Sequence, residues 1–348
     1  KQDELQPRYD ARRLVSWCAL HGGTIVESFG RTPPLHVDKP APNIDASLIL
    51  HPRHPQGRSV IPCVQADSLL ALEEHDGPRC IIHPIRGVMA RLHCRDCDWQ
   101  AVCAHCSFPL SAESNQARCR RCLTTTLLPL ECPNCGGTEL NKSIPGIDRL
   151  KQAWENHLPK TPIEWRDLTN EQLDPPFAQN TLVVVTQPNF LGSGREDLRR
   201  RERQCISFRR LAARLMEAGG KLILQCEESD MIQWTSWLTT EGLQAFFNEE
   251  RTTRQLFRYP PSARRIKVII EGDEAQALTW QITHRQHLPI SAIWEGPFQV
   301  AYRRQGQRAR TIWHLILPPE IAEQTLIQAL EPFANEAIID LDPIAFFA

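Results

Sequence analysis

Four Cys-x-x-Cys steps lie within residues 94–135 and constrain this chain more than any other feature. Two cysteines separated by two residues point both thiolates at one ion, and two such pairs complete a tetrahedral zinc site. A redox Cys-x-x-Cys is expected once, between a strand and a helix, so four steps indicate metal binding. The pattern predicts two zinc ions held by eight sulfurs, those of Cys94, Cys97, Cys103, Cys106, Cys119, Cys122, Cys132 and Cys135.

The spacing between the steps predicts how these cysteines pair. Only "DWQAV" separates the first two steps, too short a link for a hairpin that brings them face to face, whereas "SFPLSAESNQAR" separates the second and third. Because sulfur fills all four positions of each ion, we expect both zincs to be structural, each worth about 10–16 kcal/mol of folding free energy. The nested pairs are Cys103, Cys106, Cys119 and Cys122 for the inner zinc, and Cys94, Cys97, Cys132 and Cys135 for the outer zinc.

The rest of the composition indicates a cytoplasmic protein. The other five cysteines lie singly in core-like stretches rather than in a disulfide framework, which fits a reducing compartment. No apolar run approaches the ~18 residues of a membrane span, and no signal peptide opens the sequence. The 348 residues begin with Lys1, and we expect them to be part of a longer protein.

Short apolar runs alternate with helical patterns before and after the cysteines, which predicts a parallel α/β sheet covered on both faces. The expected strands are near 46–50, 79–83, 163–165, 181–186 and 221–226, and the expected helices are 11–20, 146–158 and about 196–217. The last hundred residues have the order strand, helix, strand, strand, helix, strand, which is that of a ferredoxin-like split unit.

Arginine supplies 33 of the 40 basic residues, although the formal net charge is only −1. Its planar fork suits phosphate oxygens, but a coding bias would give the same excess. Arginines are concentrated along one helical stripe and in two segments without acidic residues, 251–265 and 303–310. Each alone could be a solvated surface, whereas three together predict a nucleic-acid track. The candidate DNA contacts are Arg199, Arg203, Arg210, Arg214, Arg264, Arg265, Arg303, Arg304 and Arg308.

Trp99 is a further candidate DNA contact, because an aromatic ring can stack on a base. It could equally cap a zinc module that has little core of its own. The sequence contains no G-x-x-x-x-G-K-[ST] phosphate loop, and no nucleophile set of the Ser/His/Asp or Cys/His kind. We therefore predict no catalytic residue in this chain.

Several blocks of the sequence resemble the PriA (primosomal protein N′) family of replication restart proteins. The cysteine block is followed by "IPGIDRL", "LVVVTQ", "RYPPSARR" and "IIDLDPIAF" in that family's order and spacing. The resemblance covers essentially the whole chain, as the C-terminal portion of a longer protein. It implies a RecA-like, P-loop helicase-type lobe with an inserted double zinc-ribbon module, then a small ferredoxin-like α+β domain. The family's zinc pairing is nested.

The resemblance also implies a division into domains. We expect the remnant of a first helicase-like lobe and a linker in 1–43, and a second helicase-like lobe in 44–232 with the zinc module 91–141 inserted. A connecting helix is expected over 233–254 and the C-terminal α+β domain over 255–348.

The chain departs from the family where ATP would bind. The family's Q-x-x-G-R-x-G-R sequence becomes "RLAARLME" at 210–217, so that Glu217 replaces the second arginine while Arg214 matches the first. An arginine there stabilises charge on the transferred phosphate, and a glutamate would repel that charge. The chain thus resembles the degenerate branch typical of actinobacteria, which lacks recognisable helicase motifs, and we expect no ATP hydrolysis in it.

These observations predict a DNA-binding restart factor that recognises forked or single-stranded DNA and recruits primosome and replication proteins, without a membrane partner. Two alternatives stay open. One is an ATP-dependent 3′–5′ DNA helicase whose nucleotide-binding loop lies upstream of residue 1. The other is a zinc-ribbon nucleic-acid interaction protein of another pathway, which would prefer RNA to forked DNA.

Overall fold

The structure is a computed structural model whose described residues form two compact units. One unit contains the described residues up to 191 together with 200–246, and the other contains Arg199 and the described residues from 247 onward. The structure describes residues 42–53, 59–84, 89–94, 99–104, 110–113, 116–119, 124–167, 176–191, 199–272, 274–288, 291–299, 310–333, 336–341 and 343.

The first unit is built on a five-stranded parallel sheet with the order β1-β10-β9-β2-β8. Apolar, β-branched runs such as "LVVV" form its central strands, as expected for strands buried on both faces. The sequence-predicted strands are confirmed as β1 Ser47–Pro52, β2 Arg79–Ile82, β8 Glu164–Arg166, β9 Leu182–Val185 and β10 Lys221–Cys226.

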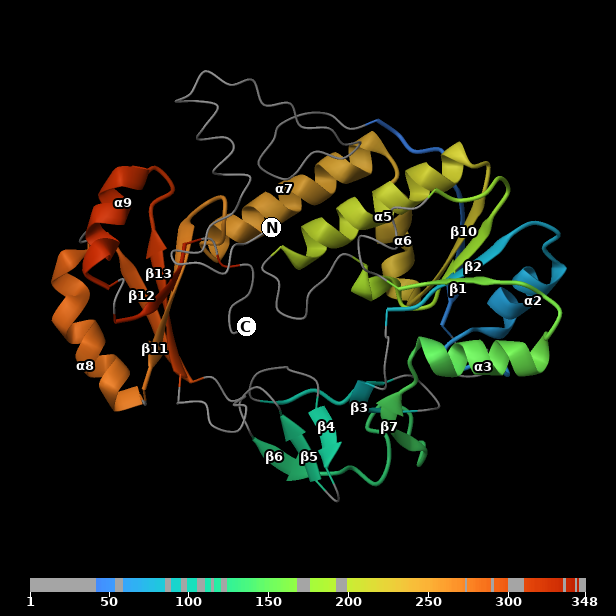
Figure 1. Cartoon of the computed structure of the whole chain (residues 1–348), viewed down its shortest axis with the longest axis horizontal. Coiled ribbons are helices and arrows are strands. Elements are labelled where there is room, and N and C mark those ends of the chain that lie inside the picture. The colour runs from blue at the N-terminus through green and yellow to red at the C-terminus, as the bar shows by residue number, and fades with distance from the viewer. Residues whose placement is uncertain are drawn as a thin grey trace. The chain divides into compact units, whose positions relative to one another are not determined.

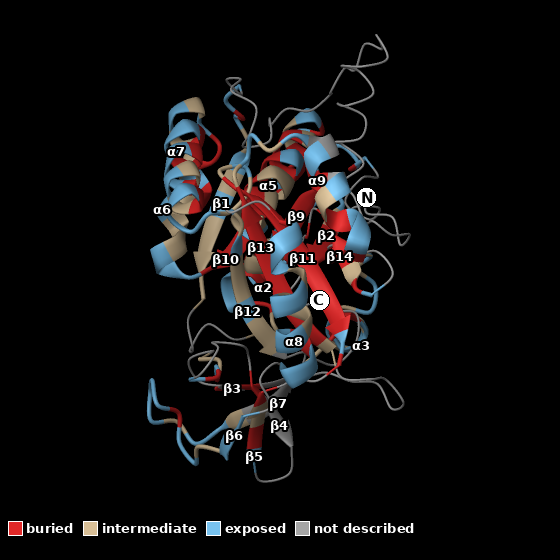
Figure 2. Ribbon diagram, turned by 90° about the vertical axis from the view of Figure 1, so that its left-hand side faces the viewer, coloured by how far each residue is buried: buried red, intermediate tan, exposed pale blue. Residues whose placement is uncertain are grey.

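Helices cover this sheet, and their apolar stripes form its core. Ile81 pairs with Val184, and Val184 pairs with Ile223, so these three residues form one row across the sheet. They are fully buried, together with Leu72 of helix α2 and Trp154 of helix α3. Figure 2 shows the buried strands in red with exposed helix faces in pale blue. The helices of this unit are α2 Ala66–Glu74, α3 Ile147–His157, α5 Arg200–Glu217 and α6 Glu228–Ser236, with the 3-10 turn η1 Pro188–Phe190.

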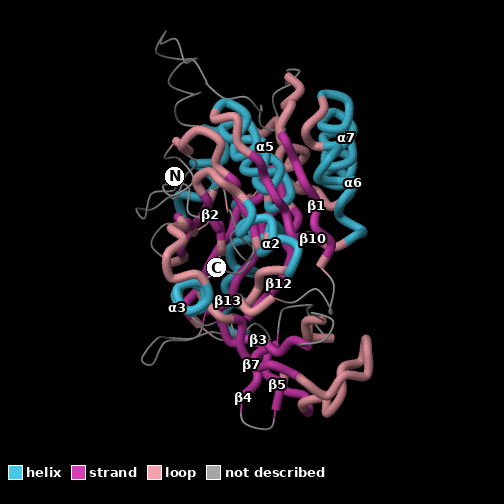
Figure 3. Tube along the Cα trace, turned by 90° about the vertical axis from the view of Figure 1, so that its right-hand side faces the viewer, coloured by secondary structure: helices cyan, strands magenta, loops and turns pink. Residues whose placement is uncertain are grey.

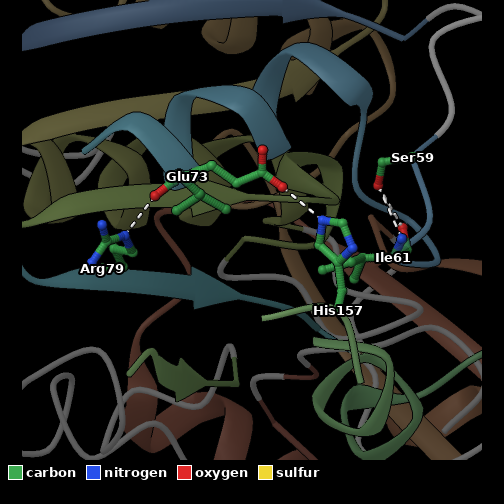
Figure 4. A network of polar contacts seen from close by, with 6 residues as sticks. Ser59, Ile61, Glu73, Arg79 and His157 are labelled. Carbon is green, nitrogen blue, oxygen red and sulfur yellow. Dashed lines mark hydrogen bonds and ion pairs between the residues drawn. The ribbon is translucent and has the colours of Figure 1, made fainter. Parts of the chain in front are cut away.

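A polar contact joins the ends of two of these helices. His157 Nε2 of α3 donates a hydrogen bond to Glu73 Oε1 of α2 at 2.7 Å, as Figure 4 shows. Nearby, Arg79 Nε donates to the carbonyl oxygen of Leu72. The start of β2 is thereby tied to the helix that precedes it.

The cysteine-rich segment lies between β2 and α3 and forms two small antiparallel sheets. One pairs β3 with β7, and the other has the order β4-β5-β6, which Figure 1 draws side by side. The tube view separates these short strands from their connecting loops (Figure 3). Their bounds are β3 Met89–Cys94, β4 Leu110–Glu113, β5 Gln116–Cys119, β6 Thr125–Leu127 and β7 Leu140–Ile144.

Two helices occupy the region where the sequence predicts one connecting helix over 233–254. α6 ends at Ser236 and α7 Thr240–Leu256 begins after a short break. The Thr239 hydroxyl accepts a hydrogen bond from the N–H of Gly242, which caps the new helix. A Cβ on Gly242 would lie 2.2 Å from the Ser236 carbonyl oxygen, so the glycine permits this tight approach.

The second unit contains a four-stranded antiparallel sheet with the order β12-β13-β11-β14. Its core includes Val268, Trp313, Leu326 and Phe333. The predicted succession of strands and helices is confirmed as β11 Arg264–Glu271, α8 Glu274–His284, β12 Ile293–Gln299, β13 Arg310–Leu317, α9 Glu323–Leu330 and β14 Ile338–Asp340, with 3-10 turns η2 Arg285–His287 and η3 Glu331–Phe333.

Two further sequence expectations concern the ends of the chain and membranes. The predicted helix 11–20 lies outside the described residues. No helix in the described part of the chain combines the length and apolar character that a membrane crossing requires.

Candidate metal centre and nucleic-acid interface

The fourth Cys-x-x-Cys step, Cys132 to Cys135, has backbone geometry suited to a metal ion. The N–H of Asn134 points at Cys132 Sγ and the N–H of Gly137 at Cys135 Sγ, each at 3.4 Å. Such N–H groups stabilise negative charge on sulfur. Gly136 has φ +72°, a left-handed conformation that glycine adopts without steric cost. The local backbone therefore directs one N–H group at each of the two sulfurs.

The same backbone hydrogen bond closes three of the four steps. The N–H of the first cysteine donates to the carbonyl oxygen five residues later, as Cys132 does to Gly137 at 2.7 Å. Cys94 donates in this way to Trp99 at 2.7 Å, and Cys119 to Thr124 at 2.9 Å. The partner expected for Cys103 lies outside the described residues. One repeated turn thus underlies the repeated motif.

Three of the four cysteines assigned to the outer zinc come together. The sulfurs of Cys94, Cys132 and Cys135 lie within 4.8 Å of one another, and those of Cys94 and Cys135 are 3.6 Å apart. A zinc tetrahedron with Zn–S bonds of about 2.3 Å has S···S edges of about 3.8 Å. The pairing of β3 with β7 brings these steps together by placing Cys94 opposite Leu140. The donor set fits a thiolate-bound metal, and Cys97, the predicted fourth ligand, lies outside the described residues.

The structure describes two of the four cysteines predicted to bind the inner zinc. Cys103 and Cys119 belong to one buried cluster with Leu92 and Leu110, while Cys106 and Cys122 lie outside the described residues. Trp99 is half-buried and packs against this cluster. That packing favours the cap over the base-stacking alternative for the Trp99 ring.

The buried cysteines of the parallel sheet have a different environment. Burial raises the pKa of the Cys80 thiol, and the charge of Glu164 raises it further. Burial likewise raises the pKa of Cys226 to about 11, helped by Asp230 and Glu227. These thiols stay protonated at neutral pH, and they serve as core side chains rather than as metal ligands.

The arginine stripe predicted on α5 is partly accessible. Arg210 is exposed, and Arg199, Arg203 and Arg214 are half-buried. Cys205, Phe208, Ala212 and Leu215 are buried on the opposite side, as their spacing predicts. Arg203, Arg210 and Arg214 therefore lie on the side of α5 opposite its buried apolar residues, while Arg199 directly precedes the helix.

Arg209, which sequence reasoning missed, is fully buried on the same helix. Its guanidinium donates to the carbonyl oxygens of Trp237 and Pro42, and burial lowers its pKa. The sequence did indicate this burial. Residue 209 follows Cys205 by four positions and Phe208 by one, which places it beside the apolar face of the helix. This arginine joins the start of the described chain to the end of α6.

Two candidate DNA contacts are buried. Arg264 and Arg265 are 4% and 3% exposed. Arg265 forms an ion pair with Glu295 at 2.8 Å and donates to the carbonyl oxygens of Arg258 and Phe257. These contacts give the Arg265 side chain a structural place in the second unit. The remaining candidates Arg303, Arg304 and Arg308 lie outside the described residues.

The carboxyl edge of the parallel sheet holds a polar network that the sequence did not single out. The strand order reverses between β2 and β9, and ligands of open α/β sheets bind at such a point. There His83 Nε2 donates to the Pro145 carbonyl oxygen at 3.1 Å, which leaves Nδ1 to accept from the Thr186 hydroxyl at 2.7 Å. Burial lowers the pKa of His83 to about 4, so the imidazole is neutral. The sequence did contain a signal for this network, because His83 and Thr186 are polar residues that directly follow apolar strands.

Sequence similarity relates the chain to two replication restart proteins. No family model matches the chain. The chain is similar to the replication restart protein PriA of Haemophilus influenzae, 26% identical over 306 residues, which cover 74% of this chain and 41% of the relative. It is also similar to the replication restart protein PriA of Borreliella burgdorferi, 22% identical over 229 residues, or 56% of this chain and 34% of the relative. The chain thus spans less than half the length of these relatives. Together these similarities support a PriA-related protein.

Proposed function

We propose that this chain is a DNA-binding replication restart factor that recognises forked DNA and recruits primosome and replication proteins in the cytoplasm. The similarity to two replication restart proteins over more than half of the chain carries the proposal. The convergence of Cys94, Cys132 and Cys135 supports it, because the resemblance implies a metal module at this place.

The metal module holds two structural zincs in the nested arrangement. The three clustered sulfurs and Cys97 bind the outer ion, and Cys103, Cys106, Cys119 and Cys122 bind the inner one. The shared cluster of Cys103 and Cys119 supports the inner pairing. With four sulfurs on each ion no position is left for water, so the ions brace the fold rather than react.

The two sheets fit the implied architecture. A RecA-like lobe accounts for the parallel sheet interrupted by a double zinc ribbon, and a ferredoxin-like domain accounts for the order β12-β13-β11-β14. In this arrangement 44–232 is the second helicase-like lobe and 255–348 the C-terminal domain, while 1–43 belongs to the first lobe.

DNA phosphates contact the accessible arginines. Arg199, Arg203, Arg210 and Arg214 are the described candidates, and Arg303, Arg304 and Arg308 are proposed as further phosphate contacts. The burial of Arg264 and Arg265 removes them from the proposed contacts. Glu217, exposed near the end of α5, replaces an arginine that hydrolysis needs, so this chain works without hydrolysing ATP.

A binding assay at matched salt tests this function. The full chain should bind a labelled fork at least about tenfold more tightly than a duplex of equal length, and neither DNA should stimulate ATPase activity. Arg210→Ala and Arg214→Ala should weaken binding and reduce its salt dependence. Equal affinity for fork and duplex would contradict fork recognition, and preference for RNA would select the interaction protein of another pathway.

A further inference from the structure

Helix α7 ends in a turn that has an unusual residue at its key position. The N–H of Arg258 donates to the Gln255 carbonyl oxygen at 3.2 Å, and the N–H of Tyr259 donates to the Arg254 carbonyl oxygen at 2.8 Å. This pair of hydrogen bonds is the Schellman motif, in which the residue after the helix cap is left-handed and is usually glycine. Here that residue is Arg258, with φ 52°.

A side chain in this conformation costs stability. The left-handed region brings Cβ close to the following carbonyl oxygen, and the penalty is about 1–2 kcal/mol. The fold would therefore be better served by glycine at this position. Strained residues cluster at functional sites, and Arg258 is exposed.

The turn around Arg258 is rigidly held. The buried Arg265 donates hydrogen bonds to the carbonyl oxygens of Phe257 and Arg258, and its guanidinium lies 4.8 Å from the centre of the Tyr259 ring. Arg265 is itself fixed by Glu295. A buried, ion-paired arginine thus sets the orientation of the loop, and the loop does not need to order when a ligand binds.

Two aromatic rings flank the strained arginine. The rings of Phe257 and Tyr259 stack with centroids 5.9 Å apart and planes inclined by 28°. Phe257 is 54% exposed, although burying a phenyl ring would be favourable. The turn in Figure 1 is the connection between α7 and β11. An exposed ring stacked on a second ring, beside a cation, provides a flat face and a charge within one loop.

We propose that Phe257, Arg258 and Tyr259 form a platform on which a base of single-stranded DNA stacks. Stacking on aromatic rings with a neighbouring arginine is how proteins hold single strands without reading their sequence. The strained arginine favours a nucleic acid over an apolar protein partner, because a hydrophobic contact would gain nothing from a cation. The platform rests on the proposed function and adds to it a site outside the α5 stripe.

The test uses the full chain and a fluorescent oligothymidine of about 20 nucleotides at fixed low salt. Phe257→Ala should weaken binding about tenfold, in the range found for one stacked base, and Phe257→Trp should restore it. Leu256→Ala is the matched control, since Leu256 is 76% exposed and next in sequence but has no aromatic face. Its affinity should equal that of the wild type.

Arg258→Gly separates a binding role from a folding role. This variant should raise the melting temperature, because glycine relieves the strain, while it weakens binding and lowers the salt slope by about one. Oligothymidine binding unchanged in Phe257→Ala and Arg258→Gly would overturn the platform. Equal losses in Leu256→Ala and Phe257→Ala, with none in Arg258→Gly, would overturn it in favour of an apolar docking site. A wild-type chain that binds neither fork nor single strand would instead refute the proposed function together with the platform.

Discussion

The imidazole of His83 donates a hydrogen bond from Nε2 to the carbonyl oxygen of Pro145 at 3.1 Å. These two residues flank the cysteine-rich insert, one directly after β2 and the other directly after β7. Thr186, at the end of β9, donates to the other ring nitrogen. A single buried side chain therefore fastens both ends of the insert to the central strands of the parallel sheet.

Acid should weaken this joint. His83 has a pKa of about 4 in the folded chain because burial disfavours its charge, against 6.5 in the unfolded chain. Above 6.5 both states are neutral. As the pH falls from 6.5 to 4 the unfolded state gains a proton that the folded state does not, so stability is lost over this range, by up to about 3 kcal/mol. Urea unfolding followed between pH 7 and 4.5 measures the loss.

A His83→Gln variant is the control for that titration. Glutamine can still donate to Pro145 but does not gain a proton in this range. The variant should be less stable at pH 7 and should lose less stability than the wild type on acidification. An identical slope in both proteins would assign the acid sensitivity to other groups.

Zinc content should follow the two predicted sets of ligands. Cys132→Ser should lower the zinc per chain from two to one, because three sulfurs hold the outer ion weakly, and Cys119→Ser should remove the inner ion. Cys63→Ser is the control, since Cys63 lies outside both sets and is half-buried. Mass spectrometry of extensively dialysed protein measures these contents. Two zincs retained in Cys132→Ser would refute the assignment of the outer site.

Substitutions of the adjacent residues Arg209 and Arg210 of α5 should have different effects, one on stability and the other on DNA binding. Arg209→Met leaves the carbonyl oxygens of Trp237 and Pro42 without their buried donor, so it should cost about 2–4 kcal/mol in free energy of unfolding. Arg210→Met changes an exposed residue and should alter stability by no more than about 0.5 kcal/mol while it weakens DNA binding. Urea unfolding and fork binding on both variants give the comparison. A stable Arg209→Met chain would refute the capping role.

Removing one partner of a buried ion pair in the second unit should lower the stability of the protein. Lys267 and Asp340 are directly opposite on β11 and β14, with Nζ and Oδ2 3.8 Å apart and both side chains almost fully buried. Lys267→Met should lower the free energy of unfolding by about 3–5 kcal/mol, because the carboxylate stays buried without its cation. Adding Asp340→Leu should recover most of the loss. Additive losses in the double variant would show that the two residues are not coupled.

The strands of the five-stranded and four-stranded sheets could be predicted because most are short, largely apolar runs bounded by turn residues. "LVVV" in β9 and "RRIKVIIE" in β11 are examples in which local pattern and tertiary environment agree. The cysteine steps were equally informative, because the chemistry of four sulfurs fixes their spacing. Local sequence thus predicted these strands and the convergence of Cys94, Cys132 and Cys135.

The roles of arginines depended on contacts that local sequence does not contain. Segment 251–265 has no acid, yet Arg265 finds Glu295 on β12, and Arg209 finds the carbonyl of Pro42. A charge run therefore indicated a nucleic-acid surface where the fold had used one arginine to brace a loop. The position of Arg209 on the helix would have identified it as a buried residue. The ion pair of Arg265 with Glu295 could not be predicted without knowing how the strands of the sheet pair.

The pairing of β1 with β10 has a consequence for how the protein is made. Ser47 aligns with Lys221, and β1 stands at the edge of its sheet, so the first described strand meets its partner only after the intervening chain has left the ribosome. Until then its apolar side chains stay in water and are open to non-native contacts, while the cysteine-rich insert has already been synthesised. The parallel sheet can therefore be completed at its β1 edge only after β10 has been synthesised.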